Sequence, residues 1–311
     1  MTHAHRHKED AWGRSLLISM ALNLIIPAAQ IWGGIVSGSM ALLSDALHNL
    51  SDFFALVINY AALIIGRRRP TPRHTFGFKR VEIFATVLSV ALLYGAAFYI
   101  AIEAWDRWIT PRPIAGKLVV WIALLGLAGN LLSAVLLHAG SKVNLNMKSA
   151  FLHMVADAAT SLGVVVLGVV WMFWPWYRLD PLFSWLVVAM ILASGWSLLK
   201  DSFLILMNAT PPGINLTEIK EAIEAIDGVT QIHDLHVWNP SNDSIALAVH
   251  ITVPDQQLSR VDELAGSVRA VLARRFHIDH PTLQFESITC NGGELLCQNG
   301  RAHDAPQTKN H

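Results

Sequence analysis

The chain has 311 residues, of which 53% are hydrophobic and only 15% are charged, and its formal net charge is zero. This balance is typical of a multi-span membrane protein with a modest soluble part. Without an excess of basic residues, the composition gives no case for a nucleic acid as a partner.

Residues 1–14 form a polar, histidine-bearing tail, and residues 15–208 form the predicted membrane domain. The first apolar stretch is longer than the core of a signal peptide and others follow it, so we expect no cleavage. Six apolar stretches are long enough to cross a hydrocarbon core of about 30 Å as helices. They cover residues 15–37, 39–65, 80–103, 117–139, 148–173 and 182–206.

Two of these stretches contain the same pair of residue types at the same spacing: His48 with Asp52, and His153 with Asp157. Residues four apart share one face of an α-helix, so each pair presents a nitrogen and an oxygen ligand in one direction. An aspartate near the middle of a bilayer costs roughly 2.5–3.5 kcal/mol, so chains carry few of them without a functional need. Two facing helices would complete a tetrahedral shell of two nitrogens and two oxygens, which suits Zn2+.

Asp45 precedes His48 by three residues and shares its helical face approximately. Two interpretations stay open at this point. Asp45 is either an outer acceptor that orients the His48 imidazole, since ligating imidazoles usually donate their other N–H to an oxygen, or a residue at the start of a helix near the interface.

Basic residues in the short loops set the orientation of a membrane protein. The loops after the second and fourth stretches carry more of them than the opposite side does, which places both termini in the cytoplasm. These residues are Arg67, Arg68, Arg69, Arg73, Lys79, Arg80, Lys142 and Lys148. Cys290 and Cys297 would then be reduced thiols.

A second domain is predicted over residues 209–290, after the linker Pro211-Pro212-Gly213. Its patterns predict helices over 216–226, with Thr217 as the cap, and over 261–276, and strands over 231–238, 245–253 and 282–288. This order gives a two-layer α+β domain with its helices on one face of the sheet. Residues 291–311 are predicted to be disordered. Five side chains in the domain are candidate ligands for a regulatory zinc at a dimer seam: His233, His236, His250, His280 and Glu286.

Four motifs give the chain a resemblance to the cation diffusion facilitator family of zinc transporters, of the bacterial zinc, cadmium and cobalt efflux type. They are residues 37–48 (SGSMALLSDALH), residues 74–77 (HTFG), the His153/Asp157 pair and residues 233–238 (HDLHVW). The resemblance implies six spans in a bacterial inner membrane, a cytoplasmic metallochaperone-like α+β domain, a homodimer and metal-for-proton antiport. It assigns the two histidine–aspartate pairs to the transport site, and it selects His233, His250 and Glu286 as the cytoplasmic metal positions.

The chain departs from some relatives in the loop after the second span. Those relatives bind a second metal there through an aspartate and two histidines. This loop keeps His74 but has Thr71 and Phe78 at the other two places, so we predict no metal in it.

The expected function is export of Zn2+, with Cd2+ or Co2+ as further candidate cargo, in exchange for protons across the lipid bilayer. The alternatives are a membrane-embedded zinc hydrolase, a passive channel and a non-transporting metal sensor. The hydrolase needs an open coordination position and a nearby general base. The sequence has no His-Glu-x-x-His motif, so we expect no enzyme and no catalytic cofactor.

Overall fold

The computed structural model describes all of the chain except residues 1–23, 142–144, 242–243, 288–294 and 296–311. The predicted N-terminal tail, both cysteines and the C-terminal tail apart from Leu295 lie outside the described residues. The chain divides into two compact units, Met1–Ala62 with Ala85–Leu199, and Leu63–Phe84 with Lys200–His311.

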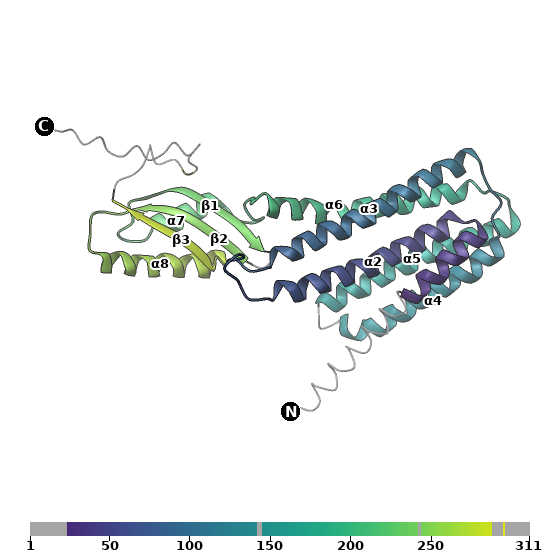
Figure 1. The fold of residues 1–311 in the computed structure, drawn as a ribbon, viewed down its shortest axis with the longest axis horizontal. Coiled ribbons are helices and arrows are strands. Elements are labelled where there is room, and N and C mark those ends of the chain that lie inside the picture. The colour runs from purple at the N-terminus through teal and green to yellow at the C-terminus, as the bar shows by residue number, and fades with distance from the viewer. Residues whose placement is uncertain (1–23, 142–144, 242–243, 288–294, 296–311) are drawn as a thin grey trace, which may run out of the picture. The chain divides into compact units, whose positions relative to one another are not determined.

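Within the described residues, five helices are long and apolar enough to cross a membrane (Figure 1). They are α2 (Met40–Gly66), α3 (Arg80–Ile109), α4 (Gly116–Ser141), α5 (Leu145–Phe173) and α6 (Leu179–Leu206). A shorter apolar helix, Leu24–Ser37, precedes them. It matches the end of the first predicted span, whose beginning at residue 15 lies outside the described residues. Five of the six expected spans are therefore present at full length.

The start of α2 is held by a side chain from another helix. Gly38 adopts a φ of 74°, a left-handed conformation that suits glycine, and the helix begins two residues later. The Asp180 carboxylate accepts hydrogen bonds from the backbone N–H groups of Met40 and Ala41, at 2.8 and 2.9 Å. Arg107 lies 3.6 Å from the same carboxylate. The first orphan donors of α2 are thus satisfied by a buried acid of α6.

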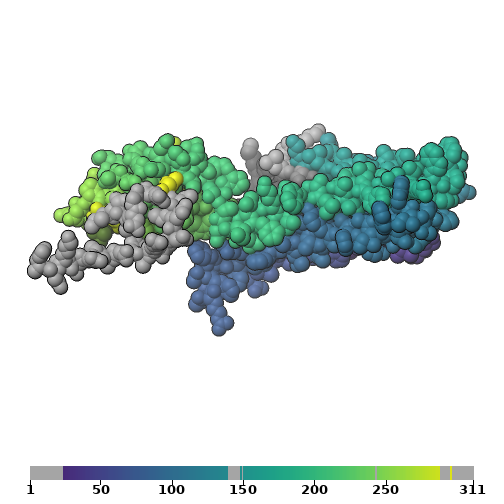
Figure 2. Space-filling view, turned by 90° about the horizontal axis from the view of Figure 1, so that it is seen from above, coloured from purple at the N-terminus to yellow at the C-terminus, as the bar shows by residue number. Residues whose placement is uncertain are grey.

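Helices α3 and α6 lie along each other in both the ribbon and the space-filling views (Figures 1 and 2). Ala97 and Ile100 of α3 pack with Val187 and Ile191 of α6 in one buried cluster. Helix α3 runs to Ile109, beyond the predicted end at residue 103. The helix continues past the predicted span through an i,i+4 contact of 3.2 Å between Glu103 and Arg107.

The second domain has the predicted order of elements (Figure 1). They are α7 (Leu216–Glu224), β1 (Gln231–Ser241), β2 (Ser244–Thr252), α8 (Leu258–Phe276) and β3 (His280–Glu286). The sheet has the order β1-β2-β3, in which β1 and β2 are antiparallel and β2 and β3 are parallel. The parallel pair is joined through α8, as such a connection requires a crossover. Both helices share one hydrophobic core with the sheet.

Three local predictions in this domain were wrong. The cap of α7 is Asn215, whose side-chain oxygen accepts from the Thr217 backbone N–H, and not Thr217 itself. Strand β1 extends through Ser241 rather than ending at residue 238, because Ser241 still pairs with Ser244. Strand β3 begins at His280 rather than residue 282, since His280 already pairs with Ala246.

Candidate metal sites

The two histidine–aspartate pairs of α2 and α5 face each other. His48 Nε2 lies 3.6 Å from Asp52 Oδ2 on its own helix and 4.0 Å from Asp157 Oδ1 on the other. His153 Nε2 lies 3.4 Å from Asp52 Oδ2 and 3.6 Å from Asp157 Oδ2. Each imidazole nitrogen is therefore shared between two carboxylates, one from each helix.

These spacings fit a shared cation better than direct hydrogen bonds. Charge-assisted N–H to carboxylate bonds measure about 2.7–2.9 Å. The ligands of a tetrahedral Zn2+, each about 2.0–2.2 Å from the metal, lie about 3.3–3.6 Å from one another. Three of the four contacts, at 3.4, 3.6 and 3.6 Å, fall in that second range.

The candidate ligands of the metal differ in their exposure to solvent. Asp157 is 4% exposed and His48 is 18% exposed, whereas His153 is 44% exposed. Asp52 Oδ2 is a buried atom without a hydrogen-bond partner in the described part of the chain. Ligand atoms of His48, Asp52 and Asp157 all lie within 4.8 Å of one another. His153 lies outside that group of three, although its Nε2 contacts both carboxylates. A buried carboxylate oxygen without a hydrogen bond, next to two imidazole nitrogens, is a candidate ligand for a divalent cation.

Asp45 makes its hydrogen bonds with side chains other than the His48 ring. Its carboxylate is fully buried and accepts hydrogen bonds from Gln30, Thr160 and Ser161. The other ring nitrogen of His48, Nδ1, is buried and has no hydrogen-bond partner among the described residues. The structure therefore shows no hydrogen bond between Asp45 and the His48 ring.

The sequence reasoning missed three polar partners of Asp45: Gln30, Thr160 and Ser161. A signal was available, since Thr160 and Ser161 follow Asp157 by three and four residues and so share its helical face. It also missed Asp180, a buried acid followed directly by a proline in an apolar helix.

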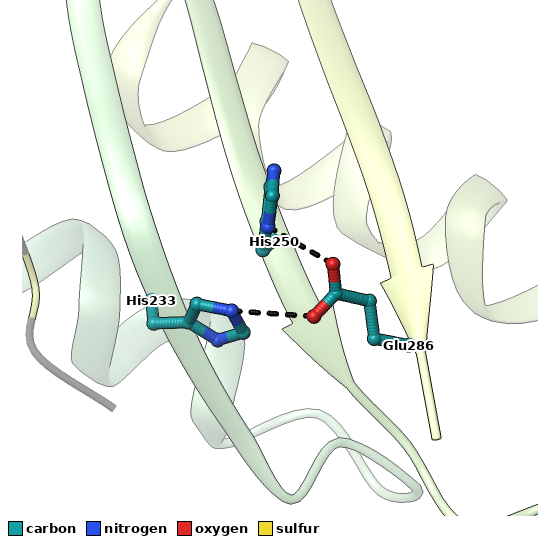
Figure 3. A group of neighbouring side chains, drawn as sticks. All are labelled: His233, His250 and Glu286. Atoms are coloured by element: carbon teal, nitrogen blue, oxygen red, sulfur yellow. Dashed lines mark ion pairs between the residues drawn. The ribbon is translucent and has the colours of Figure 1, made fainter. Parts of the chain in front are cut away.

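A second cluster lies on the sheet of the C-terminal domain (Figure 3). His233 of β1 is paired directly with His250 of β2, and Glu286 of β3 is paired with Thr252, two residues further along β2. Side chains two residues apart in a strand point to the same face, so all three meet there. His233 Nε2 lies 3.3 Å from Glu286 Oε2, and His250 Nδ1 lies 3.0 Å from Glu286 Oε1.

This cluster has the chemistry of a metal site. The ligand atoms of the three residues lie within 4.8 Å of one another. His233 is 1% exposed, and neither of its ring nitrogens has a hydrogen-bond partner in the described residues. A buried imidazole whose ring nitrogens lack hydrogen bonds is costly, and a metal bound by one of these nitrogens would offset part of that cost. Two imidazoles and a carboxylate are ligands that Zn2+ takes.

The other candidate histidines of this domain are not members of this group of three, although Asp234 contacts both His236 and His250. His236 is 55% exposed and its Nε2 lies 3.1 Å from Asp234 Oδ1. His280 pairs with Ala246, at the other end of β3 from Glu286.

In the loop before α3, His74 Nδ1 contacts Thr71 Oγ1 at 3.3 Å, and its ring lies 4.5 Å from that of Phe78.

Helices long enough to cross a membrane, with a cluster of histidines and aspartates between two of them, indicate a membrane protein with a candidate site for a divalent cation. Residues 16–207 match the family described as the cation efflux transmembrane domain. Residues 211–288 match the family of the cation efflux protein cytoplasmic domain. The chain belongs to the cation efflux family.

Curated relatives cover nearly the whole chain. The cadmium, cobalt and zinc/H(+)-K(+) antiporter of Bacillus subtilis is 35% identical over 298 residues, which are 94% of this chain and 96% of the relative. The metal cation efflux system protein CzcD of Cupriavidus metallidurans is 36% identical, over 93% of this chain and 90% of its own length. The zinc transporter ZitB of Escherichia coli is 34% identical, over 96% and 97%. The relatives are named as transporters and antiporters, so the prediction that the chain is not an enzyme is confirmed.

Proposed function

We propose that this protein exports Zn2+ from the cytoplasm in exchange for protons, through a tetrahedral site formed by His48, Asp52, His153 and Asp157. The observation that carries the proposal is the sharing of each imidazole nitrogen between carboxylates of α2 and α5, at 3.4–4.0 Å. The names of the relatives support zinc as cargo and cadmium and cobalt as further cargo.

The charge of the ligands explains how such a site carries its cargo through lipid. Two carboxylates neutralise the two charges of Zn2+, and two neutral imidazoles complete the shell without adding charge. Both ligand types must lose their protons to bind metal, so arriving protons displace the metal. Histidine is suited to such an exchange because the reference pKa of a free imidazole, about 6.5, lies close to physiological pH.

The proposed topology is six spans within residues 15–208, with both termini in the cytoplasm. The basic residues after α2 support this orientation, because short cytoplasmic loops carry an excess of Lys and Arg. With the soluble domain on the cytoplasmic side, a bundle that opens alternately to either face couples inward proton flow to outward zinc movement.

The C-terminal domain, residues 209–290, is proposed as a regulatory unit of a homodimer. His233, His250 and Glu286 would hold a regulatory Zn2+ outside the membrane. A metal that binds one arrangement of two paired domains better than another shifts the population toward it. The support is the unsatisfied imidazole of His233 and the match to the family's cytoplasmic domain.

The zinc hydrolase is not favoured, because the relatives are named as transporters. A channel and a sensor are separated from an antiporter by one experiment. The protein is reconstituted into vesicles, a pH step is imposed, and fluxes of Zn2+, Cd2+, Co2+, Mn2+ and Fe2+ are compared. We expect Zn2+ to accumulate against its own gradient. Flux that only follows the metal gradient would indicate a channel, and no flux would indicate a sensor.

A further inference from the structure

Asp45 is a fully buried carboxylate that the proposed ligand set does not use. Its Oδ2 accepts hydrogen bonds from Gln30 Nε2 and Ser161 Oγ, each at 2.9 Å. Its Oδ1 accepts one from Thr160 Oγ1, also at 2.9 Å. Three donors from the Leu24–Ser37 helix and α5 therefore satisfy an acid of α2, as a buried charge requires.

These contacts join the two helices that carry the metal ligands. Asp45 lies about one turn before His48 on α2, and Thr160 and Ser161 lie about one turn after Asp157 on α5. Thr160 Oγ1 also lies 2.8 Å from the Asp157 backbone oxygen, so its single hydroxyl proton is shared between that oxygen and Asp45 Oδ1. The bridge thus reaches from the α2 ligands to the backbone of an α5 ligand.

The surroundings hold the bridge in place. Ser161 Oγ also accepts from Asn130 Nδ2 of α4 at 3.4 Å, so a fourth helix is attached. Gly126 of α4 packs directly against the Gln30 amide, and a Cβ at residue 126 would overlap Gln30 Nε2. The network therefore has little room to rearrange.

We propose that Asp45 is a positioning residue that fixes the register between α2 and α5 at which the two histidine–aspartate pairs meet. The inference rests on the proposed function of these pairs as the zinc site. A slip of one residue along a helix moves a side chain by about 1.5 Å. The contacts of 3.4–4.0 Å between the pairs leave no such margin, because a functional site needs its ligands held to within about 0.5 Å.

Two variants distinguish the loss of the hydrogen-bonded contacts of Asp45 from the loss of its negative charge. Asp45→Ala removes both the bridge and the negative charge. In Asp45→Asn, the amide nitrogen at the Oδ1 position donates to Thr160 Oγ1, which still donates to the Asp157 carbonyl. The remaining oxygen accepts from Gln30 and Ser161 as before. Asp45→Asn therefore removes the charge and keeps every contact.

The test measures Zn2+ and Cd2+ affinity of the purified full chain in lipid nanodiscs by competition with a chromophoric chelator. His233→Ala and His250→Ala are present throughout, so that binding reports on the membrane site. Loss of an outer partner of a metal site typically costs about 10–100-fold in affinity. We expect a Zn2+ loss of that size and a smaller preference for Zn2+ over Cd2+ in Asp45→Ala, and affinity within about threefold of the parent in Asp45→Asn.

Two further variants keep the test decisive if Asp45→Ala does not fold. Ser161→Ala and Thr160→Val each remove one donor and should each weaken Zn2+ binding. Ser133→Ala is the matched control, because Ser133 is a buried serine of α4 whose hydroxyl has no hydrogen-bond partner in the described residues. It should bind like the parent.

Two outcomes overturn the inference. The first is a Zn2+ affinity equal to that of the parent in Asp45→Ala, or in both Ser161→Ala and Thr160→Val. The second is an equal loss of Zn2+ affinity in Asp45→Asn and Asp45→Ala, which would assign the effect to charge. Failure of the proposed function looks different. In that case the parent itself binds no Zn2+ in the membrane domain.

Discussion

Replacing Asp157 by asparagine tests the charge balance of the transport site. The side chain is 4% exposed and lies 4.0 and 3.6 Å from the nitrogens of His48 and His153. The amide keeps the volume but leaves the loaded site with one net positive charge. A charge inside the membrane costs roughly 2.5–3.5 kcal/mol, which at about 1.4 kcal/mol per factor of ten weakens Zn2+ binding by about 60- to 300-fold.

The assay is Zn2+ competition in nanodiscs combined with flux in vesicles. Asp106→Asn on α3 is the matched control, because Asp106 is 54% exposed and pairs with Arg112 outside the cluster. We expect Asp157→Asn to insert normally, to bind Zn2+ weakly and to transport none, while the control behaves like the parent. Parent affinity and flux in Asp157→Asn would refute the reasoning.

Four other perturbations test further parts of the structure. His48→Asp changes the shell to one nitrogen and three oxygens, so Mn2+ and Cd2+ should compete better against Zn2+ in transport; an unchanged competition profile would remove His48 from the choice of metal. The double variant His233→Ala with His250→Ala should shift the zinc concentration for half-maximal flux but keep proton coupling, whereas His280→Ala should change neither; complete loss of flux, or a curve identical to the parent, would exclude regulation. Zn2+ affinity of the membrane site should fall as the pH is lowered, because protons compete with the metal for the same ligand atoms, and a Kd that stays flat from about pH 8 to pH 5.5 would contradict proton exchange. Asn215→Ala should lower the opening free energy of α7 by about 0.5–2 kcal/mol in hydrogen exchange, and unchanged protection of its first turn would contradict the cap.

Periodicity was sufficient to predict the order of the elements and the shared helical face of each histidine–aspartate pair, because both depend on local spacing. The His48/Asp52 and His153/Asp157 pairs share a helical face whatever the rest of the chain does. The strand pattern likewise placed His233 and His250 on neighbouring strands, and the sheet pairs them directly.

What could not be predicted depends on contacts between distant residues. The partners of Asp45 come from positions 15 and more than 100 residues away, so spacing within α2 gave no information about them. The α7 cap depends on which backbone first turns helical, and both Asn215 and Thr217 are good caps. Strand β1 contains an irregularity between His233 and His236, where Asp234 adopts a φ of 49°. Such a bulge shifts the alternation of faces, and no residue pattern in the sequence indicated it.

The most direct test of the central claim follows zinc and protons at the same time in one vesicle preparation. A zinc-sensitive and a pH-sensitive dye are enclosed together, and the wild-type chain is compared with Asp157→Asn. The account predicts that zinc movement in the wild type produces proton movement in the opposite direction, that collapsing the pH gradient stops zinc accumulation, and that both fluxes disappear together in Asp157→Asn. Zinc flux that continues without counter-movement of protons, or that survives in Asp157→Asn, would contradict it.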